Sequence, residues 1–509
     1  MLISPRPLAG LMLALAAVVI GTSAVALWAA PATQPGQRLH VLNDVTHVYN
    51  FFLAWNSKIG RAYLPAKGQT CTANHRTISS IDFEPFNVFW VPLGNNRDLP
   101  YADGDAGHVM QFVRDDGGGV FFYEAHNRAD AELVHANAFV KQFGFQLTTK
   151  KMAEPIQLAD HPLTAGIEDA RFFSSRHGLK LTRPDAWEVL CTDADGRPMI
   201  AVRTIGKGRL VAAGGNLLSE PRKDKDGNRP PAVNLELVQG LLKWAGAPKA
   251  VAPADTMPFK LAPERTMTLE TIRLMHSAYT QPYASQIGEI YEKLRPHMKA
   301  WMGVPLAAGK GRLNVHLLAT GGGGWSSGDT IGLGVFWGGF PANTEGMIGL
   351  IGHELNHSWV LPHAEPLGNE GIAIYAGLKM AERLGDAEAV RADIAKRIEA
   401  LRADPHFKEF DPCEPLTDEV RQKVGRRLTI RKYMVVLYDF EQTYGKDAVA
   451  RYFRAKRKLV PARDYRYTGH DSAWIWSQAL GEDVFGALND YGIHVRRDQV
   501  TLPAAKDAK

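Results

Sequence analysis

Apolar and polar positions alternate in short runs through the first half of the chain, with helical segments between the runs. Runs of strand length fall at 40–45, 86–93, 120–124, 198–204 and 209–213. Helical spacing occurs at 109–114 and 235–244, and the turn 205–208 joins the last two runs into a predicted hairpin. Strands that alternate with helices are typical of a parallel sheet covered by helices. We therefore predict an α/β domain over residues 38–246.

The second half has longer helical patterns. Residues 247–265 are rich in Pro and Ala, lack periodicity and predict a linker. One or two helices are predicted over 269–302, with breaks at Pro282 and Pro296. Further along, the pattern predicts strands at 312–318 and 330–337, a solvated amphipathic helix over 379–404, and a helix over 433–444 that ends at Gly445 before another helix. A second domain is therefore expected over residues 266–500.

One short stretch of the second domain carries the chemistry. Residues 351–360 contain His353, Glu354 and His357 in the pattern H-E-x-x-H. Residues four apart lie on one face of a helix, so the two imidazoles can face the same point. Two neutral imidazoles suit zinc, and Glu354 then lies beside a metal-bound water that it can deprotonate. The stretch predicts a zinc site, against the alternative of two core histidines with a surface glutamate.

A catalytic zinc needs a third protein ligand and an open fourth position. Glu370 follows a Pro- and Gly-rich turn, 361–368, and begins a second apolar helix. A turn of this length lets the second helix fold back on the first, which makes Glu370 the predicted third ligand. Glu365, within the turn itself, is the alternative ligand.

The H-E-x-x-H pattern at 353–357, followed by N-E-G-x-A-x-Y at 369–375, resembles the gluzincin zinc peptidases. The resemblance implies an α+β, mainly helical domain. It also implies that His353, His357 and Glu370 bind Zn²⁺ and that Glu354 is the general base. The N-E-G-x-A-x-Y form is similar to aminopeptidase N-like enzymes, whereas the short spacing before Glu370 is closer to enhancin- and mucinase-type relatives.

The same resemblance implies a substrate cleft and an oxyanion donor. In gluzincins an edge strand before the zinc helix binds the extended substrate, here within 326–335, after the glycine-rich run 321–324. The predicted substrate-binding residues are Ser326, Gly328, Asp329 and Gly332; a flexible hairpin tip is the alternative. A Tyr or His donor usually stabilises the oxyanion. The candidates are Tyr433, Tyr465, Tyr467 and His470, and the sequence does not choose among them.

The first domain resembles the class I glutamine amidotransferase-like fold, in its ThuA-like branch. The residues that carry this resemblance lie at 117–122, 161–166 and 206–216. The amidotransferases place a cysteine nucleophile on the turn after the central strand, but here 123–127 contains no cysteine. Glutaminase chemistry is therefore not expected. Glu124 and His126 can line a crevice at the strand ends, where a structural or binding role is favoured over catalysis.

Composition narrows the function classes. The chain has 509 residues, of which 45% are hydrophobic and 22% charged, with a net charge of +5. Such a small charge and the lack of a basic stripe interleaved with aromatics give no case for nucleic acid as a partner. Three cysteines are too few for a disulfide scaffold, and one disulfide, Cys71 to Cys191, is favoured, which leaves Cys413 unpaired.

The N-terminus predicts export. An apolar run from Leu8 to about Ile20 precedes small residues that suit a signal-peptidase site, so residues 1–32 are a signal peptide or an uncleaved anchor. We therefore expect a secreted or periplasmic zinc peptidase that acts on proteins or glycoproteins. An endopeptidase is favoured, because only Asp329 offers an anchor for a free amine near the edge strand. The alternatives are a zinc aminopeptidase and a non-catalytic binding protein on a peptidase fold.

Overall fold

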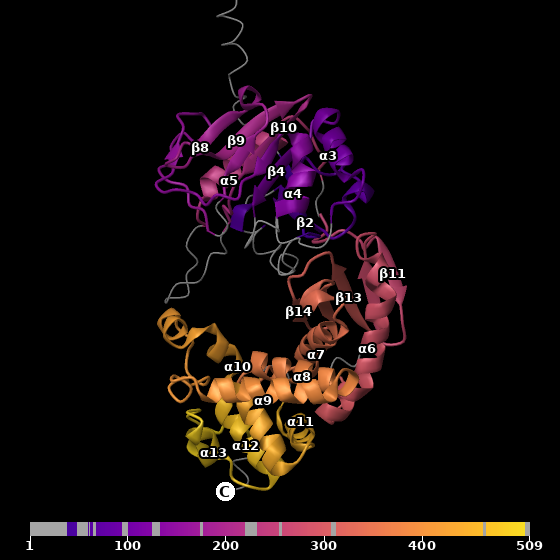
Figure 1. Ribbon diagram of the computed structural model, residues 1–509, viewed down its shortest axis with the longest axis vertical. Helices are drawn as coiled ribbons and strands as arrows, with labels where there is room; N and C mark the ends of the chain where they lie inside the picture. The colour runs from indigo at the N-terminus through magenta and orange to yellow at the C-terminus, as the bar shows by residue number, and fades with distance from the viewer. Residues whose placement is uncertain are drawn as a thin grey trace, which may run out of the picture.

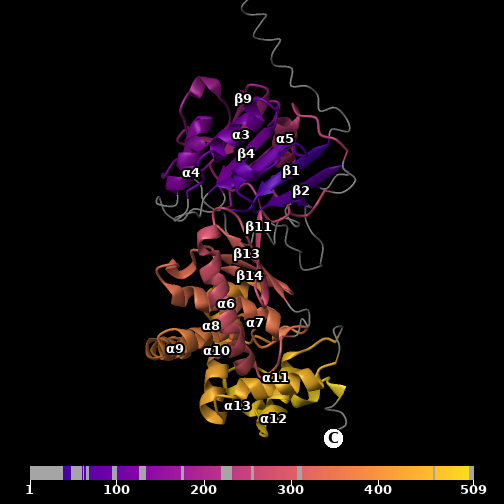
Figure 2. The same cartoon turned by 90° about the vertical axis from the view of Figure 1, so that its right-hand side faces the viewer.

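The chain forms an N-terminal α/β part and a mainly helical C-terminal part, arranged along the long axis of the molecule (Figure 1; Figure 2). The structure is a computed structural model. It describes residues 38–47, 60, 62–64, 68–93, 100–124, 133–173, 177–218, 232–253, 257–306, 312–461 and 465–503. The segment 1–32 and His126 lie outside the described residues, so the predictions made for them stay predictions.

The N-terminal part is built on an eight-stranded sheet with the order β2-β1-β3-β4-β10-β9-β8-β6. Its strands are β1 (Leu39–Asp44), β2 (Gln69–Asn74), β3 (Val88–Leu93), β4 (Gly119–Glu124), β6 (Gln157–Leu158), β8 (Glu188–Thr192), β9 (Pro198–Ile205) and β10 (Gly208–Ala213). The strands from β2 to β10 in this order pair in parallel, whereas β9, β8 and β6 add antiparallel. The predicted parallel sheet and the β9–β10 hairpin are therefore confirmed.

Helices cover both faces of this sheet. Successive residues of a strand point to opposite faces, and in β3 Trp90 packs toward α5 (Leu235–Gly246) while Phe89 packs toward α3 (Asp105–Arg114) and α4 (Leu133–Val140). A short antiparallel pair, β5 (Phe145–Leu147) with β7 (Leu179–Leu181), lies outside the main sheet. Strands buried on both faces need continuous apolar runs, which is the pattern that β3 and β4 show.

The expected Cys71–Cys191 disulfide is wrong. No disulfide joins the cysteines of the described chain, including Cys413. Cys71 lies in β2 and Cys191 in β8, and β1, β3, β4, β10 and β9 lie between these two strands in the sheet. Sequence spacing says nothing about strand order, which is why the pairing was not predictable.

The C-terminal part begins with a five-stranded sheet in the order β11-β12-β13-β15-β14. Its strands are β11 (Arg265–Thr268), β12 (Ile272–His276), β13 (Leu313–Leu318), β14 (Gly324–Ser327) and β15 (Thr330–Gly334). The helices predicted over 269–302 are therefore wrong at their start, because 272–276 is a strand. From Gln281 to Met302 the helix α6 is continuous: Pro282 lies in its first turn, where no N–H is needed, and Pro296 lies inside it.

Helices follow to the end of the chain. They are α7 (Thr344–Val360), α8 (Asn369–Leu384), α9 (Ala387–Arg402), α10 (Asp418–Tyr444), α11 (Ala448–Leu459), α12 (Gly469–Leu480) and α13 (Phe485–Asp490). The single helix predicted over 379–404 is wrong: α8 ends before Gly385, and Asp386 caps α9 by accepting hydrogen bonds from two backbone N–H groups. The predicted end of a helix at Gly445 is confirmed. No helix in the described part of the chain is long and apolar enough to span a membrane.

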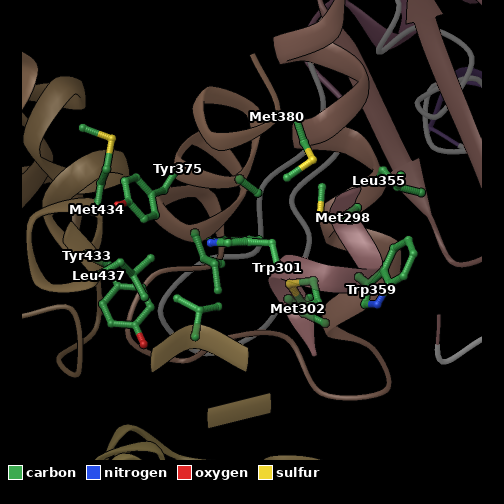
Figure 3. Packing of buried hydrophobic residues seen from close by; sticks show 14 of the residues in the cluster. Met298, Trp301, Met302, Leu355, Trp359, Tyr375, Met380, Tyr433, Met434 and Leu437 are labelled. Carbon is green, nitrogen blue, oxygen red and sulfur yellow. The ribbon is translucent and has the colours of Figure 1, made fainter. Parts of the chain in front are cut away.

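Behind α7, apolar side chains of several helices form one core (Figure 3). This core contains Met298, Trp301 and Met302 of α6, Leu355 and Trp359 of α7, Tyr375 and Met380 of α8, and Tyr433, Met434 and Leu437 of α10. Full burial of one large apolar side chain contributes roughly 1.5–3 kcal/mol. The packing of so many large side chains holds α7 and α8 in place from behind.

Polar contacts join the two parts of the molecule. The Tyr279 hydroxyl donates to Asp105 Oδ2 at 2.6 Å and accepts from the Ile78 N–H at 3.0 Å. Lys260 Nζ lies 2.9 Å from His316 Nε2. Within the predicted linker, Lys260 also bridges to Ala73 of β2, so this stretch runs along the edge of the N-terminal sheet.

Candidate metal centre

Helices α7 and α8 approach each other closely because glycines line their contact. A Cβ on Gly377 would lie 2.4 Å from the Gly349 carbonyl oxygen, and a Cβ on Gly352 would lie 3.0 Å from Gly377 Cα. No side chain fits at these positions without a shift of one helix. The close approach brings the first turn of α8, with Glu370, opposite the two histidines of α7.

The predicted zinc ligands come together. His353 Nε2 and His357 Nε2 are 3.2 Å apart, and the Glu370 carboxylate oxygens lie 3.5 Å from each of these nitrogens. In a tetrahedral zinc site with bonds of about 2.0–2.1 Å, ligand atoms are separated by about 3.3–3.4 Å. The donor types therefore suit zinc, and each imidazole nitrogen lies close to this distance from one of the two Glu370 carboxylate oxygens, Oε2 for His353 and Oε1 for His357.

The two imidazoles are in the form that binds a metal. Burial lowers the pKa of His353 from 6.5 to about 3, and the neighbouring His357 acts in the same direction. The pKa of His357 is also lowered by burial, although the negative charge of Glu370 opposes this effect. Neutral imidazoles offer the lone pair that a metal needs.

An amide orients one of these rings. The Asn369 side-chain amide lies with Nδ2 2.9 Å from His357 Nδ1. Oδ1 of the same amide accepts from the Glu365 N–H at 3.3 Å. If a metal were bound at His357 Nε2, Nδ1 would carry the proton, and the amide would have to turn over and give up the Glu365 contact to accept it. Asn369 was part of the sequence motif, but its contact with His357 was not predicted.

Glu354 lies beside the ligands in a buried position. Its side chain is 4% exposed, and Oε1 is 3.9 Å from His353 Nε2. Burial raises the pKa of the Glu354 carboxyl from 4.5 to about 8, and the charge of Glu370 adds to this rise. A cation at the histidines favours the ionised carboxylate, which is the form a general base needs.

Strand β14 runs over this carboxylate. A Cβ on Gly324 would lie 2.5 Å from both Cγ and Oε1 of Glu354. Gly324 therefore allows the strand to touch the Glu354 carboxylate. The glycine run 321–324 was noted in the sequence, but only the tertiary structure distinguishes Gly324 from its neighbours.

The predicted substrate-binding residues fall at different places on the β14–β15 hairpin. Ser326 lies on β14, the edge strand of the sheet, and its hydroxyl is 2.9 Å from that of Ser358 on α7. Gly328 and Asp329 form the hairpin turn between β14 and β15. Gly332 lies on β15, which is paired on both sides, so its backbone offers no free edge. Of the two hairpin strands, β14 is the one at an edge of the sheet.

A pocket of about 760 Å³ extends from this edge across the helices. Gly324, Trp337, His353, Glu354 and Glu370 are among its lining residues. Trp337 is 40% exposed and is one of the few large apolar side chains that reach the surface of the described chain. The sequence analysis did not single out this tryptophan, because nothing in its local pattern distinguishes it from a core residue.

The alternative ligand Glu365 has its hydrogen-bond partners on α11 and α12, not among the histidines of α7. Its carboxylate accepts from Tyr452 at 2.6 Å and Ser472 at 2.8 Å, and Lys456 Nζ lies 3.4 Å away. These three groups take up the lone pairs of a fully buried carboxylate. Glu365 is therefore a structural residue that holds the turn to α11 and α12.

None of the four oxyanion candidates is among the residues that line the pocket. Tyr433 is buried, and its hydroxyl accepts from Trp476 Nε1 at 2.8 Å. Tyr465 and Tyr467 make hydroxyl contacts with Thr501 and Tyr452 respectively. His470 Nδ1 accepts from the Arg496 N–H. The described residues therefore do not place any of these four side chains at the site.

In the N-terminal part, Glu124 lies at the end of β4 and is fully buried. Its Oε1 is 2.6 Å from His177 Nδ1, and Oε2 accepts from the His177 N–H at 3.3 Å. This contact ties β4 to the chain that precedes β7. It is consistent with a structural role for Glu124.

Comparisons with known proteins give no family for the chain. No family model matches it, and no curated protein matches it. Among solved structures, it is similar to a ThuA-like protein from Parabacteroides merdae, with 12% identity over 43% of this chain and 93% of that one, at a TM-score of 0.29.

Two other solved structures are similar to a comparable degree. An exo-beta-1,4-mannosidase from an Opitutaceae bacterium shares 11% identity over 35% of this chain and 31% of that one, at a TM-score of 0.25. A cytoplasmic protein from Salmonella typhimurium shares 11% identity over 41% and 98%, at a TM-score of 0.27. Likenesses of this size carry no argument about function.

Proposed function

We propose that this protein is a zinc-dependent peptidase that hydrolyses peptide bonds of proteins or glycoproteins. The observation that carries the proposal is the meeting of His353 and His357, whose Nε2 atoms are 3.2 Å apart, with the Glu370 carboxylate, which places Oε2 3.5 Å from His353 Nε2 and Oε1 3.5 Å from His357 Nε2, beside the buried Glu354. Two histidines and one carboxylate leave a fourth position for water or substrate, as in catalytic rather than structural zinc sites. Zinc at these atoms lowers the pKa of a bound water and polarises a carbonyl oxygen.

Glu354 is the proposed general base and acid. Its carboxylate takes a proton from the attacking water and later delivers it to the leaving amine. Contact with Gly324 fixes the carboxylate on the pocket side of α7. Its position 3.9 Å from His353 Nε2 would keep it within reach of a water bound to a metal that His353, His357 and Glu370 would hold.

The edge strand β14 is the proposed substrate platform. Its free backbone groups can pair with an extended peptide, and Gly324 places that peptide next to Glu354. Asp329, the acidic residue of the hairpin, is not among the pocket-lining residues, so it supplies no anchor for a free amine there. An endopeptidase is therefore favoured over an aminopeptidase. We also propose a secreted or periplasmic location, on the basis of segment 1–32 alone.

The test is zinc content by mass spectrometry of purified wild type and Glu354→Gln, together with cleavage of casein and a mucin-type glycoprotein. We expect one zinc per chain in both proteins and cleavage by wild type alone, because Glu354 activates water without binding the metal. Absence of zinc from wild type contradicts the proposal at its centre. Zinc without cleavage by wild type favours the alternative of a non-catalytic binding protein.

A further inference from the structure

The pocket that contains the metal ligands is also lined by a cluster of arginines. These are Arg397 of α9 and Arg426, Arg427 and Arg431 of α10. Strand β14 contacts α7, α7 contacts α8, and α8 contacts both α9 and α10, so the pocket crosses two helices between the edge strand and the arginines. We call these four residues the arginine wall.

Most of the arginine wall lacks a counterion among the described residues. Asp393 lines the same pocket and accepts from Arg397 Nε at 2.6 Å. Arg426, Arg427 and Arg431 make no ion pair within the described chain, and Arg431 Nε is buried without a hydrogen-bond partner there. A buried donor that is left unsatisfied costs roughly 1–3 kcal/mol. Because this nitrogen has almost no exposed surface, an anion in the pocket would act on Arg431 through its charge and not through this donor.

The arginine wall also destabilises helix α10, which carries three of its four residues. Helix α10 breaks at Gly425, whose φ of 73° is left-handed, so Arg426 and Arg427 begin a new helical segment. Cations at the positive end of a helix are unfavourable, as are like charges four residues apart such as Arg427 and Arg431. Burial and the neighbouring arginines lower the pKa of Arg431, and the negative charge of Asp393 opposes this effect. These costs are understandable if an anion binds between the arginines.

Other carboxylates of the pocket do not fill this place. Glu354 and Glu370 belong to the proposed metal centre, and Glu345 lies in the first turn of α7. We propose that the arginine wall binds a carboxylate of the substrate, so that the peptidase selects acidic segments on one side of the cleaved bond. This inference rests on the proposed function. The carboxylate can belong to an acidic side chain or to an acidic sugar of a glycoprotein.

The test compares matched substrates. One arm uses a peptide from the cleaved region of casein, made with Glu residues and again with Gln. The other uses a mucin glycopeptide with and without sialic acid. We expect wild type to show a kcat/KM about tenfold higher for the acidic member of one pair, in low salt, and a smaller ratio in high salt. The double variant Arg426→Gln with Arg427→Gln should bring that ratio close to one.

Arg421→Gln is the matched control, because Arg421 is exposed on the same helix and does not line the pocket. The ratio should not change in this variant. The arm that shows the preference identifies the source of the carboxylate. An equal kcat/KM for both members of both pairs in wild type overturns the proposal, as does a preference that persists in the double variant.

Substrate binding can be measured without cleavage, so it tests the arginine wall independently of the proposed peptidase activity. Fluorescence anisotropy measures the affinity of the labelled acidic and neutral substrates for Glu354→Gln, which does not require cleavage. Tighter binding of the acidic member, lost in the triple variant with Arg426→Gln and Arg427→Gln, supports the arginine wall even if wild type has no peptidase activity. Equal binding of both members contradicts it even if wild type is an active peptidase.

Discussion

Glu365, in the turn between α7 and α8, and Glu370, in the first turn of α8, are close in sequence but have opposite surroundings. The Glu365 side chain is 0% exposed, and Lys456 lies 3.4 Å from it. The Glu370 side chain is 51% exposed and lies 3.5 Å from each of two imidazoles. In sequence both were candidates for the third zinc ligand. In the structure only Glu370 faces the histidines.

The difference lies in how many hydrogen-bond donors each carboxylate already has. Tyr452, Ser472 and Lys456 all point at Glu365, so this anion is compensated without a metal. Glu370 faces two neutral imidazoles that offer lone pairs rather than a cation. A carboxylate and two neutral imidazoles with converging lone pairs suit a positive ion between them, which is the zinc ion proposed above. The burial of a carboxylate is therefore a poor guide to function, and the nature of its partners is a better one.

The largest expected effect is the loss of the metal in Glu370→Gln. Removal of a direct ligand should weaken zinc binding by more than the 10–100-fold that is typical of outer partners, and peptidase activity should fall by about a thousandfold or more. Competition with a chromogenic chelator measures the zinc affinity. Glu365→Gln is the matched control. At temperatures where this variant is folded, its zinc affinity should equal that of wild type. Equal loss of zinc from Glu370→Gln and Glu365→Gln would contradict the assignment of different roles to the two glutamates.

The next expected effect is on the free energy of unfolding. It should be large when Glu365 is replaced and small when Glu370 is replaced. Glu365→Gln leaves the Lys456 ammonium buried without an anion, which typically costs about 3–5 kcal/mol in the free energy of unfolding. Denaturant unfolding of the metal-free proteins measures this cost. Glu370→Gln should unfold close to wild type under the same conditions. Addition of Lys456→Met to Glu365→Gln should restore part of the stability, since the uncompensated charge is gone; a further loss would show that packing rather than charge matters there.

Local pattern was a sound guide where the structure depends on short-range geometry. The four-residue spacing of His353 and His357 and the length of the turn before Glu370 were enough to predict that these three side chains lie together. Zinc binding by them stays a prediction. The strands β1, β3, β4, β9 and β10 also lie where alternation predicted them. Residues 272–276 were predicted to be helical because they adjoin a long helical pattern, and their place between β11 and β13 in a sheet cannot be read from one strand.

Features that depend on long-range packing could not be predicted from the sequence. The arginine wall combines α9 and α10, and only their packing on α8 directs Arg397 and Arg431 to the pocket of α7. The strand order that separates Cys71 from Cys191 is equally invisible in their spacing. Contact of Gly324 with Glu354 belongs to the same class, because it joins the edge of a sheet to the middle of a helix.

The third and smallest expected effect concerns the contact between Gly324 and Glu354. Glu354 is a buried carboxylate beside the proposed metal ligands. In Gly324→Ala the new Cβ would lie 2.5 Å from Oε1 of Glu354, so the carboxylate or β14 must shift. A displacement of about 1 Å at a reacting group can lower the rate about a hundredfold. We therefore expect kcat to fall by about this factor while zinc content stays at one per chain, because Glu354 is not a ligand.

Gly321→Ala is the matched control for this prediction. It lies in the same glycine run, its φ is not left-handed, and its new Cβ would have ordinary contacts, 3.8 Å from the Phe336 carbonyl oxygen. Its kcat should stay within about twofold of wild type, since no catalytic group moves. If Gly324→Ala and Gly321→Ala lower kcat equally, flexibility of the glycine run matters more than the position of Glu354. If Gly324→Ala instead loses zinc, then Glu354 and the ligands respond as one unit, and the division between a metal-binding and a proton-transferring carboxylate does not hold.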